Sequence, residues 1–277
     1  MRAYFLSDLH LGAYPETEQA SVPRLMAFLD HVVRTGGQLF IVGDLLDFWF
    51  EYSTVVPRRP FQLLARLKRM VDEGCEVTYI AGNHDYWMGD FLAREVGVHP
   101  VRDAVETTLG GRRFFISHGD GIATTNRRGY RAFKGFLHSR VVVTSFRWLH
   151  PDLGLRLADV VSKLSRRRSS RNSNGPNLTG FAERKAAEGF DFIVLGHLHR
   201  PKIFEAGGAT CLLVGDWIDN FTYGLYTDGR LTLERWSEAE GAADVGTDTG
   251  ADAGRNVSGE TAPGLTSPLR ATGKSSP

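Results

Sequence analysis

The amino-acid sequence predicts an α/β fold built from layers of strands and helices. Two observations indicate this class: short apolar runs alternate with segments of helical spacing, and most of the apolar runs end in a cluster of polar residues. The chain has 277 residues, 42% of them hydrophobic, which is enough to bury the core of one large domain.

Six short apolar segments are predicted to be buried strands, because each is rich in the residues that strands favour. These segments are Arg2–Ser7, Gln38–Val42, Val77–Ala81, Arg113–Ser117, Phe190–Leu195 and Thr210–Val214. Between them, Val22–Arg34 and Pro60–Glu73 have helical spacing, and Pro60 stands where the first turn of a helix tolerates proline.

The C-terminal part of the chain differs from this alternation. Tyr223–Tyr226 and Leu231–Trp236 flank the turn Asp228-Gly229, which predicts a β-hairpin. Beyond it, residues 237–277 contain no aromatic side chain and are rich in Gly, Ala, Ser and Thr. Such a segment buries too little apolar surface to offset chain entropy, so we predict a folded domain over 1–236 and a disordered tail over 237–277.

Charge and cysteine content limit the compartment and the partners. The net charge of +1 excludes a uniformly basic nucleic-acid-binding protein. Cys75 and Cys211 are too few for a disulfide framework, which favours a reducing compartment. The N-terminus reaches the acidic Asp8 too soon for a signal peptide, and no apolar run is long enough to span a membrane. We therefore expect a cytoplasmic protein.

A basic stretch interrupts the alternation between the fourth and fifth predicted strands. Residues 126–171 contain twelve basic residues and two acidic ones, and their apolar residues are spaced as on helices. We predict a basic, amphipathic helical insertion over about 122–178. Ordinary packing with solvated arginines is the alternative interpretation.

Five of the predicted strands end in residues that can bind metal. The seven candidate ligands in these clusters are Asp8 and His10, Asp44, Asn83, His118, and His197 and His199. Ligands of α/β sheets bind outside the carboxyl ends of the strands, so five such ends predict one site. Carboxylate, imidazole and amide donors suit manganese, iron or zinc, and seven candidate ligands are too many for one ion but fit two.

In this order, the motifs D-x-H, G-D, G-N-H-D, H-G-D and G-H-x-H resemble those of the calcineurin-like binuclear metallophosphoesterases. The resemblance covers about residues 1–236 and implies a four-layer αββα sandwich with a helical cap insertion. It also implies that one divalent ion is bound by Asp8, His10, Asp44 and His199, and the other by Asn83, His118, His197 and the bridging Asp44. We expect Mn²⁺, with iron, zinc and nickel as alternatives.

The same resemblance implies a catalytic role for two of these residues. His84 matches the position that supports the leaving group as an acid or a hydrogen-bond donor, and Asp44 bridges the two ions. The implied reaction is in-line attack of hydroxide on phosphorus, with the ions stabilising the attacking and departing oxygens. Asp47, Asp85 and Asp120 adjoin these positions, and we expect them to form hydrogen bonds around the site rather than to bind metal.

Within the family, the chain resembles the branch that splits UDP-2,3-diacylglucosamine in lipid A biosynthesis. The run Phe48-Trp49-Phe50 and the basic insertion carry this resemblance, although the best-known group of that branch has Arg at the position of His84. The implied products are UMP and 2,3-diacylglucosamine 1-phosphate (lipid X). The alternatives are a broader metallophosphodiesterase or phosphatase, acting on nucleotides or phosphoproteins, and a non-catalytic scaffold.

The insertion is where the lipid-linked substrate is expected to bind. Its apolar faces could hold acyl chains, and Arg offers bidentate donors to a phosphate. The candidate substrate-binding residues are Lys163, Arg166, Arg167 and Arg168. We also expect peripheral contact with the cytoplasmic face of the inner membrane, no nucleic-acid partner and no obligatory protein partner. Asp216, in Gly215-Asp216-Trp217, resembles a further ligand but exceeds the number that two ions require.

Overall fold

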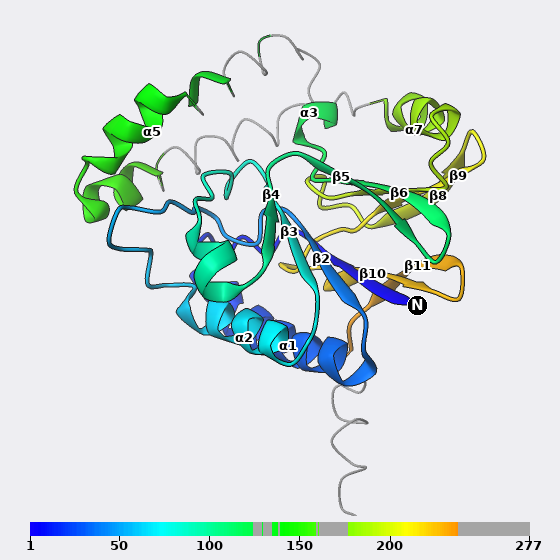
Figure 1. Ribbon diagram of the computed structural model, residues 1–277, viewed down its shortest axis with the longest axis horizontal. Helices are drawn as coiled ribbons and strands as arrows, with labels where there is room; N and C mark the ends of the chain where they lie inside the picture. Colours follow the sequence, from blue (N-terminus) through cyan, green and yellow to red (C-terminus); the bar gives the residue numbers. More distant parts are fainter. Residues whose placement is uncertain (124–128, 130–134, 138, 159, 161–176, 238–277) are drawn as a thin grey trace, which may run out of the picture.

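The computed structural model describes residues 1–123, 129, 135–137, 139–158, 160 and 177–237. In this part of the chain, eleven strands form two sheets (Figure 1). The four predicted substrate-binding residues and the predicted tail from residue 238 onward lie outside the described residues.

The first sheet has six strands and contains the N-terminal strand near its middle. Its order is β11 (Arg230–Arg235), β10 (Thr222–Thr227), β1 (Arg2–Leu6), β2 (Gln38–Val42), β3 (Val77–Ile80) and β4 (His99–Val101). Strands β1 to β4 are parallel, whereas β10 and β11 form the predicted hairpin and join β1 antiparallel. Asp228 and Gly229 both have positive φ, at 51° and 80°, as a tight hairpin turn requires.

The second sheet has five strands. Its order is β5 (Ala104–Leu109), β6 (Arg112–Ser117), β7 (Phe192–Leu195), β9 (Ala209–Leu213) and β8 (Lys202–Ala206). The central strands β6, β7 and β9 are parallel, and β5 and β8 are antiparallel edges.

The two sheets pack face to face through a layer of aromatic and aliphatic side chains. Phe5 of β1 stacks on Phe40 of β2 and on Phe114 of β6, with ring centroids 5.3 and 5.9 Å apart. Phe114 stacks in turn on Phe192 of β7 at 4.7 Å. Alternate residues of β1 and β2 face the other way, so these strands are buried on both faces and their sequences are continuously apolar.

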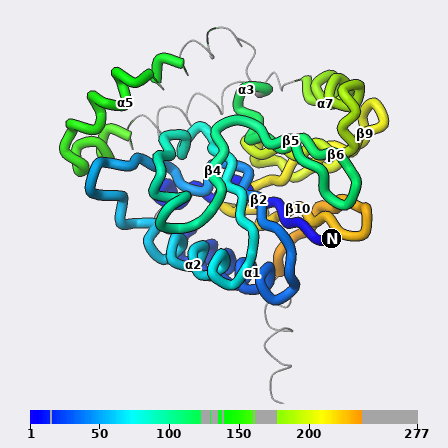
Figure 2. Tube along the Cα trace, in the orientation of Figure 1, coloured from blue at the N-terminus to red at the C-terminus, as the bar shows by residue number. Residues whose placement is uncertain are grey.

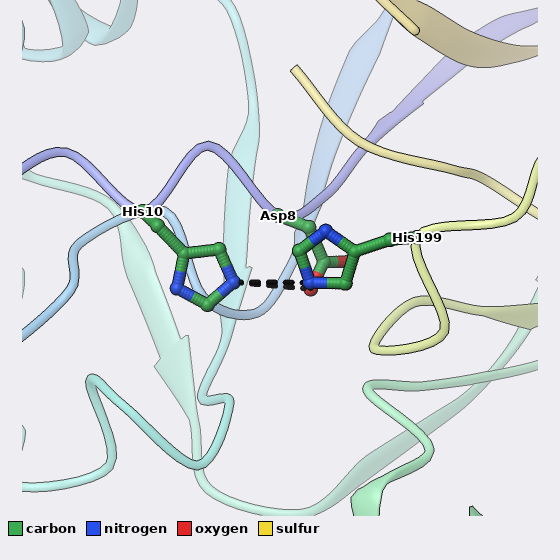
Figure 3. Close-up of side chains that lie close together, drawn as sticks. All are labelled: Asp8, His10 and His199. Carbon is green, nitrogen blue, oxygen red and sulfur yellow. Dashed lines mark hydrogen bonds and ion pairs between the residues drawn. The ribbon is translucent and has the colours of Figure 1, made fainter. Parts of the chain in front are cut away.

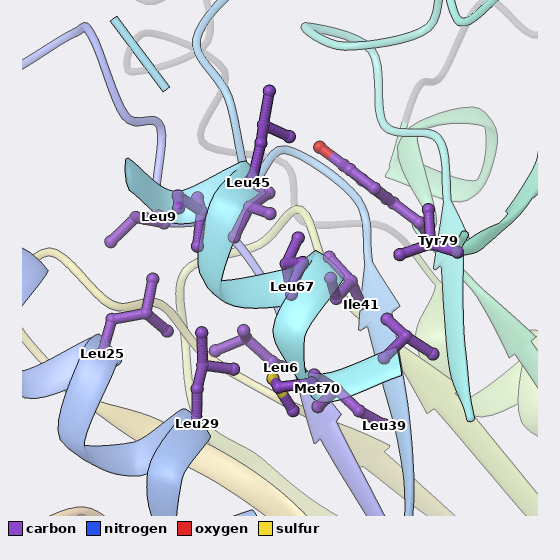
Figure 4. Packing of buried hydrophobic residues seen from close by; sticks show 14 of the residues in the cluster. Leu6, Leu9, Leu25, Leu29, Leu39, Ile41, Leu45, Leu67, Met70 and Tyr79 are labelled. Carbon is purple, nitrogen blue, oxygen red and sulfur yellow. The ribbon is translucent and has the colours of Figure 1, made fainter. Parts of the chain in front are cut away.

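Helices cover the outer face of each sheet. Helices α1 (Pro15–Thr35) and α2 (Phe61–Asp72) pack on the first sheet, where Leu29 and Leu67 lie among buried residues of β1 and β2 (Figure 4). Helix α7 (Leu178–Ala187) packs on the second sheet through Ala182. The order helix, sheet, sheet, helix confirms the predicted αββα sandwich.

The short helices lie in the connections. They are the π-helical turn η1 (Leu92–Val96), α3 (Asp120–Ala123) and α5 (Arg140–Arg147), and residues 151–158 are also helical. Helix α5 belongs to the predicted insertion. It lies on the opposite side of the view from α7, so it is separate from the outer helical layer of the second sheet (Figure 2).

The predicted strands and both predicted helices are present, with two kinds of difference. Helix α1 begins at Pro15 rather than at Val22, because its first turns are polar and lack apolar periodicity; Pro23 lies inside it. Strands β4, β5 and β8 and helix α7 were not predicted from the sequence. The three strands lie at sheet edges and have exposed, mixed sequences, so pairing with a neighbour decides their conformation.

Candidate metal centre

The predicted metal ligands all follow the carboxyl ends of parallel strands. Asp8 and His10 follow β1, Asp44 follows β2, Asn83 follows β3, His118 follows β6, and His197 and His199 follow β7. Both sheets therefore contribute to one site. Their ligand atoms form three groups in which all atoms lie within 4.8 Å of one another: Asp8, His10 and His199; His10, Asp44 and His84; and Asp44, His118 and His197.

In the first group, three donor atoms face a common point (Figure 3). Nε2 of His10 and Nε2 of His199 are 3.3 Å apart, and Oδ1 of Asp8 lies 3.6 Å from the former and 3.4 Å from the latter. That oxygen is buried and has no hydrogen-bond partner. A buried, unpartnered carboxylate oxygen beside two imidazole nitrogens is the arrangement that a bound cation would satisfy.

The group of Asp44, His118 and His197 is centred on His118. Its Nε2 lies 3.2 Å from Oδ2 of Asp44 and 3.2 Å from Oδ1 of Asn83, while its Nδ1 lies 2.9 Å from the carbonyl oxygen of Val42. A proton on Nδ1 donated to that carbonyl fixes the ring, so that loss of the proton on Nε2 directs a lone pair into the site, as is typical of metal-binding histidines. Oδ2 of Asp44 is also 3.7 Å from Nε2 of His10, so Asp44 lies between the two groups.

His84 belongs to the remaining group, with His10 and Asp44, and is held by its Nδ1. That nitrogen is 3.0 Å from the carbonyl oxygen of Asp47 and 3.2 Å from its Oδ1, so Asp47 orients the ring. The backbone N–H of His84 donates to Oδ1 of Asp44 at 2.9 Å. The Nδ1 contacts hold the ring, and the backbone bond holds the loop that carries it.

The backbone of the site is held in an unusual conformation. Seven non-glycine residues in the described chain have positive φ, and five of them are predicted ligands. These five, with φ between 49° and 69°, are Asp8, His10, Asp44, His197 and His199. Each left-handed residue costs about 1–2 kcal/mol, and such residues cluster at functional sites because the surrounding structure imposes them. Here the backbone N–H of His10 donates to the carbonyl of Asp44 at 2.9 Å, and that of His197 to Oδ2 of Asp8 at 2.8 Å.

Two glycines allow the strands to approach this closely. A Cβ at Gly82 would lie 2.0 Å from Oδ1 of Asp44, and one at Gly43 would lie 2.4 Å from Nδ1 of His118. Gly43 also has φ of 83°. The glycines that precede Asp44 and Asn83 in the sequence are therefore both required by space, and Gly43 by its conformation as well.

The electrostatic balance of the site favours cations. Burial disfavours the charged form of His10, but the carboxylates of Asp47, Asp8 and Asp44 outweigh burial and raise its pKa to about 10. At His118 the carboxylate of Asp44 is the main cause that outweighs burial, and the pKa is again raised to about 10. Burial and the neighbouring charge of His118 instead lower the pKa of His197 to about 4. The carboxylates thus keep His10 and His118 protonated, and a divalent ion would supply that positive charge in place of the protons. The donor set fits two such ions.

Hydrogen bonds around the site involve both expected and unexpected residues. Asp85, expected to act as a supporting residue, accepts from the hydroxyl of Tyr79 at 2.6 Å and from the N–H of Gly82 at 2.7 Å. Two unexpected residues are Tyr79 and Ser7, and the hydroxyl of Ser7 donates to Oδ2 of Asp8. The signal for Ser7 was its place directly before Asp8 at a strand end; no local signal marks Tyr79.

An aromatic cluster connects the insertion to the rim of the site. Phe146 of α5 packs against Phe50 and Trp87, with ring centroids 4.7 and 5.2 Å apart, and against Phe48 at 5.9 Å. Phe48 follows Asp44 and Asp47, and Trp87 follows His84 and Asp85. The insertion therefore packs against the two loops that carry Asp44 and His84.

Two packed sheets with carboxylate, imidazole and amide donors gathered at their carboxyl ends define a metallohydrolase of the phosphoesterase class. The chain belongs to the calcineurin-like phosphoesterase family, whose sequence pattern matches residues 1–201. This confirms the family predicted from the motifs, and membership implies divalent metal ions.

Three relatives share most of the chain, and each carries the name UDP-2,3-diacylglucosamine hydrolase. The protein of Porphyromonas gingivalis is 29% identical over 86% of this chain and 99% of its own. That of Neisseria meningitidis serogroup B is 30% identical over 82% and 94%, and that of Haemophilus influenzae strain PittGG is 26% identical over 79% and 92%. None of the helices in the described residues has the length and apolar character needed to cross a membrane.

Proposed function

We propose that this protein hydrolyses the pyrophosphate bond of UDP-2,3-diacylglucosamine and releases UMP and 2,3-diacylglucosamine 1-phosphate. The observation that carries the proposal is the gathering of all seven predicted metal ligands at one end of an αββα sandwich, beneath an insertion fastened to the same loops. The names of the relatives support the substrate, because the similarity extends over nearly the whole length of those proteins.

The proposed ligands divide between two ions, with Mn²⁺ as the ion we expect. Asp8, His10 and His199 would hold one ion, and Asn83, His118 and His197 the other. Asp44 would bridge them, since its Oδ2 lies near Nε2 of both His10 and His118. When bound, the two ions would supply Lewis-acid stabilisation of the phosphate oxygens and lower the pKa of water.

In this proposal His84 and Asp44 act together at the reacting phosphate. Burial disfavours a charged His84, but the carboxylates of Asp44 and Asp47 outweigh it and raise its pKa. With Nδ1 bonded to Asp47, the ring can present a proton on Nε2 to the departing oxygen. Asp44 holds the backbone N–H of His84 through Oδ1 while Oδ2 faces the proposed ions, so one carboxylate positions both.

The insertion has the surface that a lipid substrate requires. Val141 and Trp148 of the α5 segment are 75% and 87% exposed, and Leu153 and Leu157 of the following helix are also exposed. We propose that such apolar side chains contact acyl chains and the membrane surface that contains them, with Arg147 among the neighbouring cations. Cosedimentation with anionic vesicles should fall on Trp148→Ser and persist on Thr144→Ser; equal binding by both variants would refute the contact.

The test of the proposed reaction is release of UMP by the Mn²⁺-loaded protein. UDP-2,3-diacylglucosamine would be offered beside UDP-N-acetylglucosamine and bis(p-nitrophenyl) phosphate, with Asp44→Ala as the control. We expect cleavage of the lipid substrate, absent in the variant. Hydrolysis of the generic ester without the lipid would favour the broader phosphodiesterase instead, and no hydrolysis with no bound metal would favour a scaffold.

A further inference from the structure

The loop between β9 and β10 contains the motif Gly215-Asp216-Trp217, which the ligand set does not use. This loop crosses from the second sheet to the first at the end where the metal centre lies. It contacts the site at two points: the N–H of Trp217 donates to the carbonyl of Asp8 at 3.1 Å, and Nδ2 of Asn220 donates to the carbonyl of His199 at 3.3 Å.

Asp216 organises this loop with one of its oxygens. The side chain is buried, with 3% of the residue exposed, and its Oδ1 accepts from the backbone N–H groups of Ile218, Asp219 and Asn220 at 2.9, 2.8 and 3.2 Å. These three bonds form a tight turn and need only Oδ1. The other oxygen, Oδ2, accepts from Nδ2 of Asn220 at 2.6 Å and is directed toward His199.

His199 presents its two ring nitrogens in opposite directions. Nε2 faces Asp8 and His10, whereas Nδ1 lies 3.8 Å from Oδ2 of Asp216 (Figure 3 shows the Nε2 side). The side chain is 38% exposed and its ring stacks on that of His10, so burial alone does not fix its orientation. A carboxylate on the Nδ1 side favours the tautomer with its proton there, which leaves the lone pair of Nε2 for a metal.

We propose that Asp216 is a positioning residue that orients His199 for the ion held by Asp8, His10 and His199. This inference rests on the proposed ligand assignment. It explains why the motif resembles a ligand motif although two ions do not require Asp216 as a ligand. The carboxylate of Asp216 faces Nδ1 of His199, on the side of the ring away from the proposed ions. Asn220 completes the arrangement, because it bonds both to Oδ2 of Asp216 and to the backbone of His199.

The test compares Asp216→Asn with Asp219→Asn. An Asn at 216 retains an oxygen for the three backbone N–H groups of the turn but loses the negative charge facing His199. Asp219 is three residues away and exposed, so its variant removes the same charge from the same turn without facing the ligand. Binding of Mn²⁺ to the metal-free proteins would be measured calorimetrically, and the visible spectrum of bound Co²⁺ would report the geometry of the ligands.

We expect Asp216→Asn to weaken one of two Mn²⁺-binding steps by roughly tenfold to a hundredfold and to alter the Co²⁺ spectrum. The other step, and both steps in Asp219→Asn, should match the wild type. Unchanged binding in Asp216→Asn would overturn the proposal, as would equal weakening of both steps or a wild-type protein that binds fewer than two ions. A wild-type protein that binds two ions but releases no UMP from the lipid would refute the proposed substrate and leave this role of Asp216 standing.

Discussion

Binding of divalent metal should release protons from this protein. In the metal-free site the pKa values of His10 and His118 are raised to about 10, so both rings are protonated at pH 8, whereas His197, with a pKa of about 4, is neutral. A histidine must lose its proton to bind metal, so filling both positions should release about two protons per chain from these two rings. The apparent affinity for each ion should rise about tenfold per pH unit from pH 7 to 9.

The measurement is titration of the metal-free protein with Mn²⁺ at pH 8 in two buffers of different ionisation enthalpy. The dependence of the observed heat on the buffer gives the number of protons released. The variant His10→Asn should release about one proton fewer, whereas His99→Asn, at an exposed position of β4, should match the wild type.

The reasoning would be refuted if the heat of tight Mn²⁺ binding showed no dependence on the buffer, or if His10→Asn released as many protons as the wild type.

The stability of the metal-free protein should also depend on pH. The folded metal-free protein binds these protons more tightly than the unfolded chain, whose histidines have a pKa near 6.5. Its stability should therefore decline as pH rises from 6.5 through about 10.

Two further predictions concern residues that hold the site together. Phe146→Ala removes the ring that packs on Phe50 and Trp87. It should raise KM for the lipid substrate roughly tenfold and leave hydrolysis of bis(p-nitrophenyl) phosphate intact. Thr144→Ala is the neutral control, and equal loss of both activities in Phe146→Ala would be the contrary result. Asp85→Ala leaves the buried hydroxyl of Tyr79 without its acceptor and should lower the free energy of unfolding, measured in urea, by about 3 kcal/mol. Adding Tyr79→Phe to this variant should lower that free energy little further. Full additivity of the two changes would contradict the pairing of Asp85 with Tyr79.

The interior of the fold was predictable because a strand that is buried on both faces has a continuous apolar sequence. Phe5 and Phe40 pack between the sheets while Tyr4 and Leu39 face the helices, so β1 and β2 are apolar at nearly every position. The edge strand β8 lacks such a sequence. Its residues are largely exposed, and its conformation follows from pairing with β9.

The gathering of the candidate ligands was predictable for a related reason. Parallel strands bring their carboxyl ends to one edge, so polar residues placed directly after each apolar run must meet there. The conformations that complete the site carry no such signal. The left-handed residues Asp8 and His199 are both held by hydrogen bonds from the loop that contains Trp217 and Asn220, which is separate from them in the sequence.

Asp216 shows where inference from local sequence stops. Like Asp44, it follows a glycine at the end of an apolar strand, and the two motifs cannot be told apart by spacing or residue type. The difference lies in the neighbouring strands. Asp44 follows β2, between β1 and β3, and its Oδ2 faces the histidines of two groups; Asp216 follows β9 and its carboxylate turns back onto its own loop and the rear of His199. The direction in which each carboxylate faces therefore depends on where its strand lies in the sandwich, which no single motif contains.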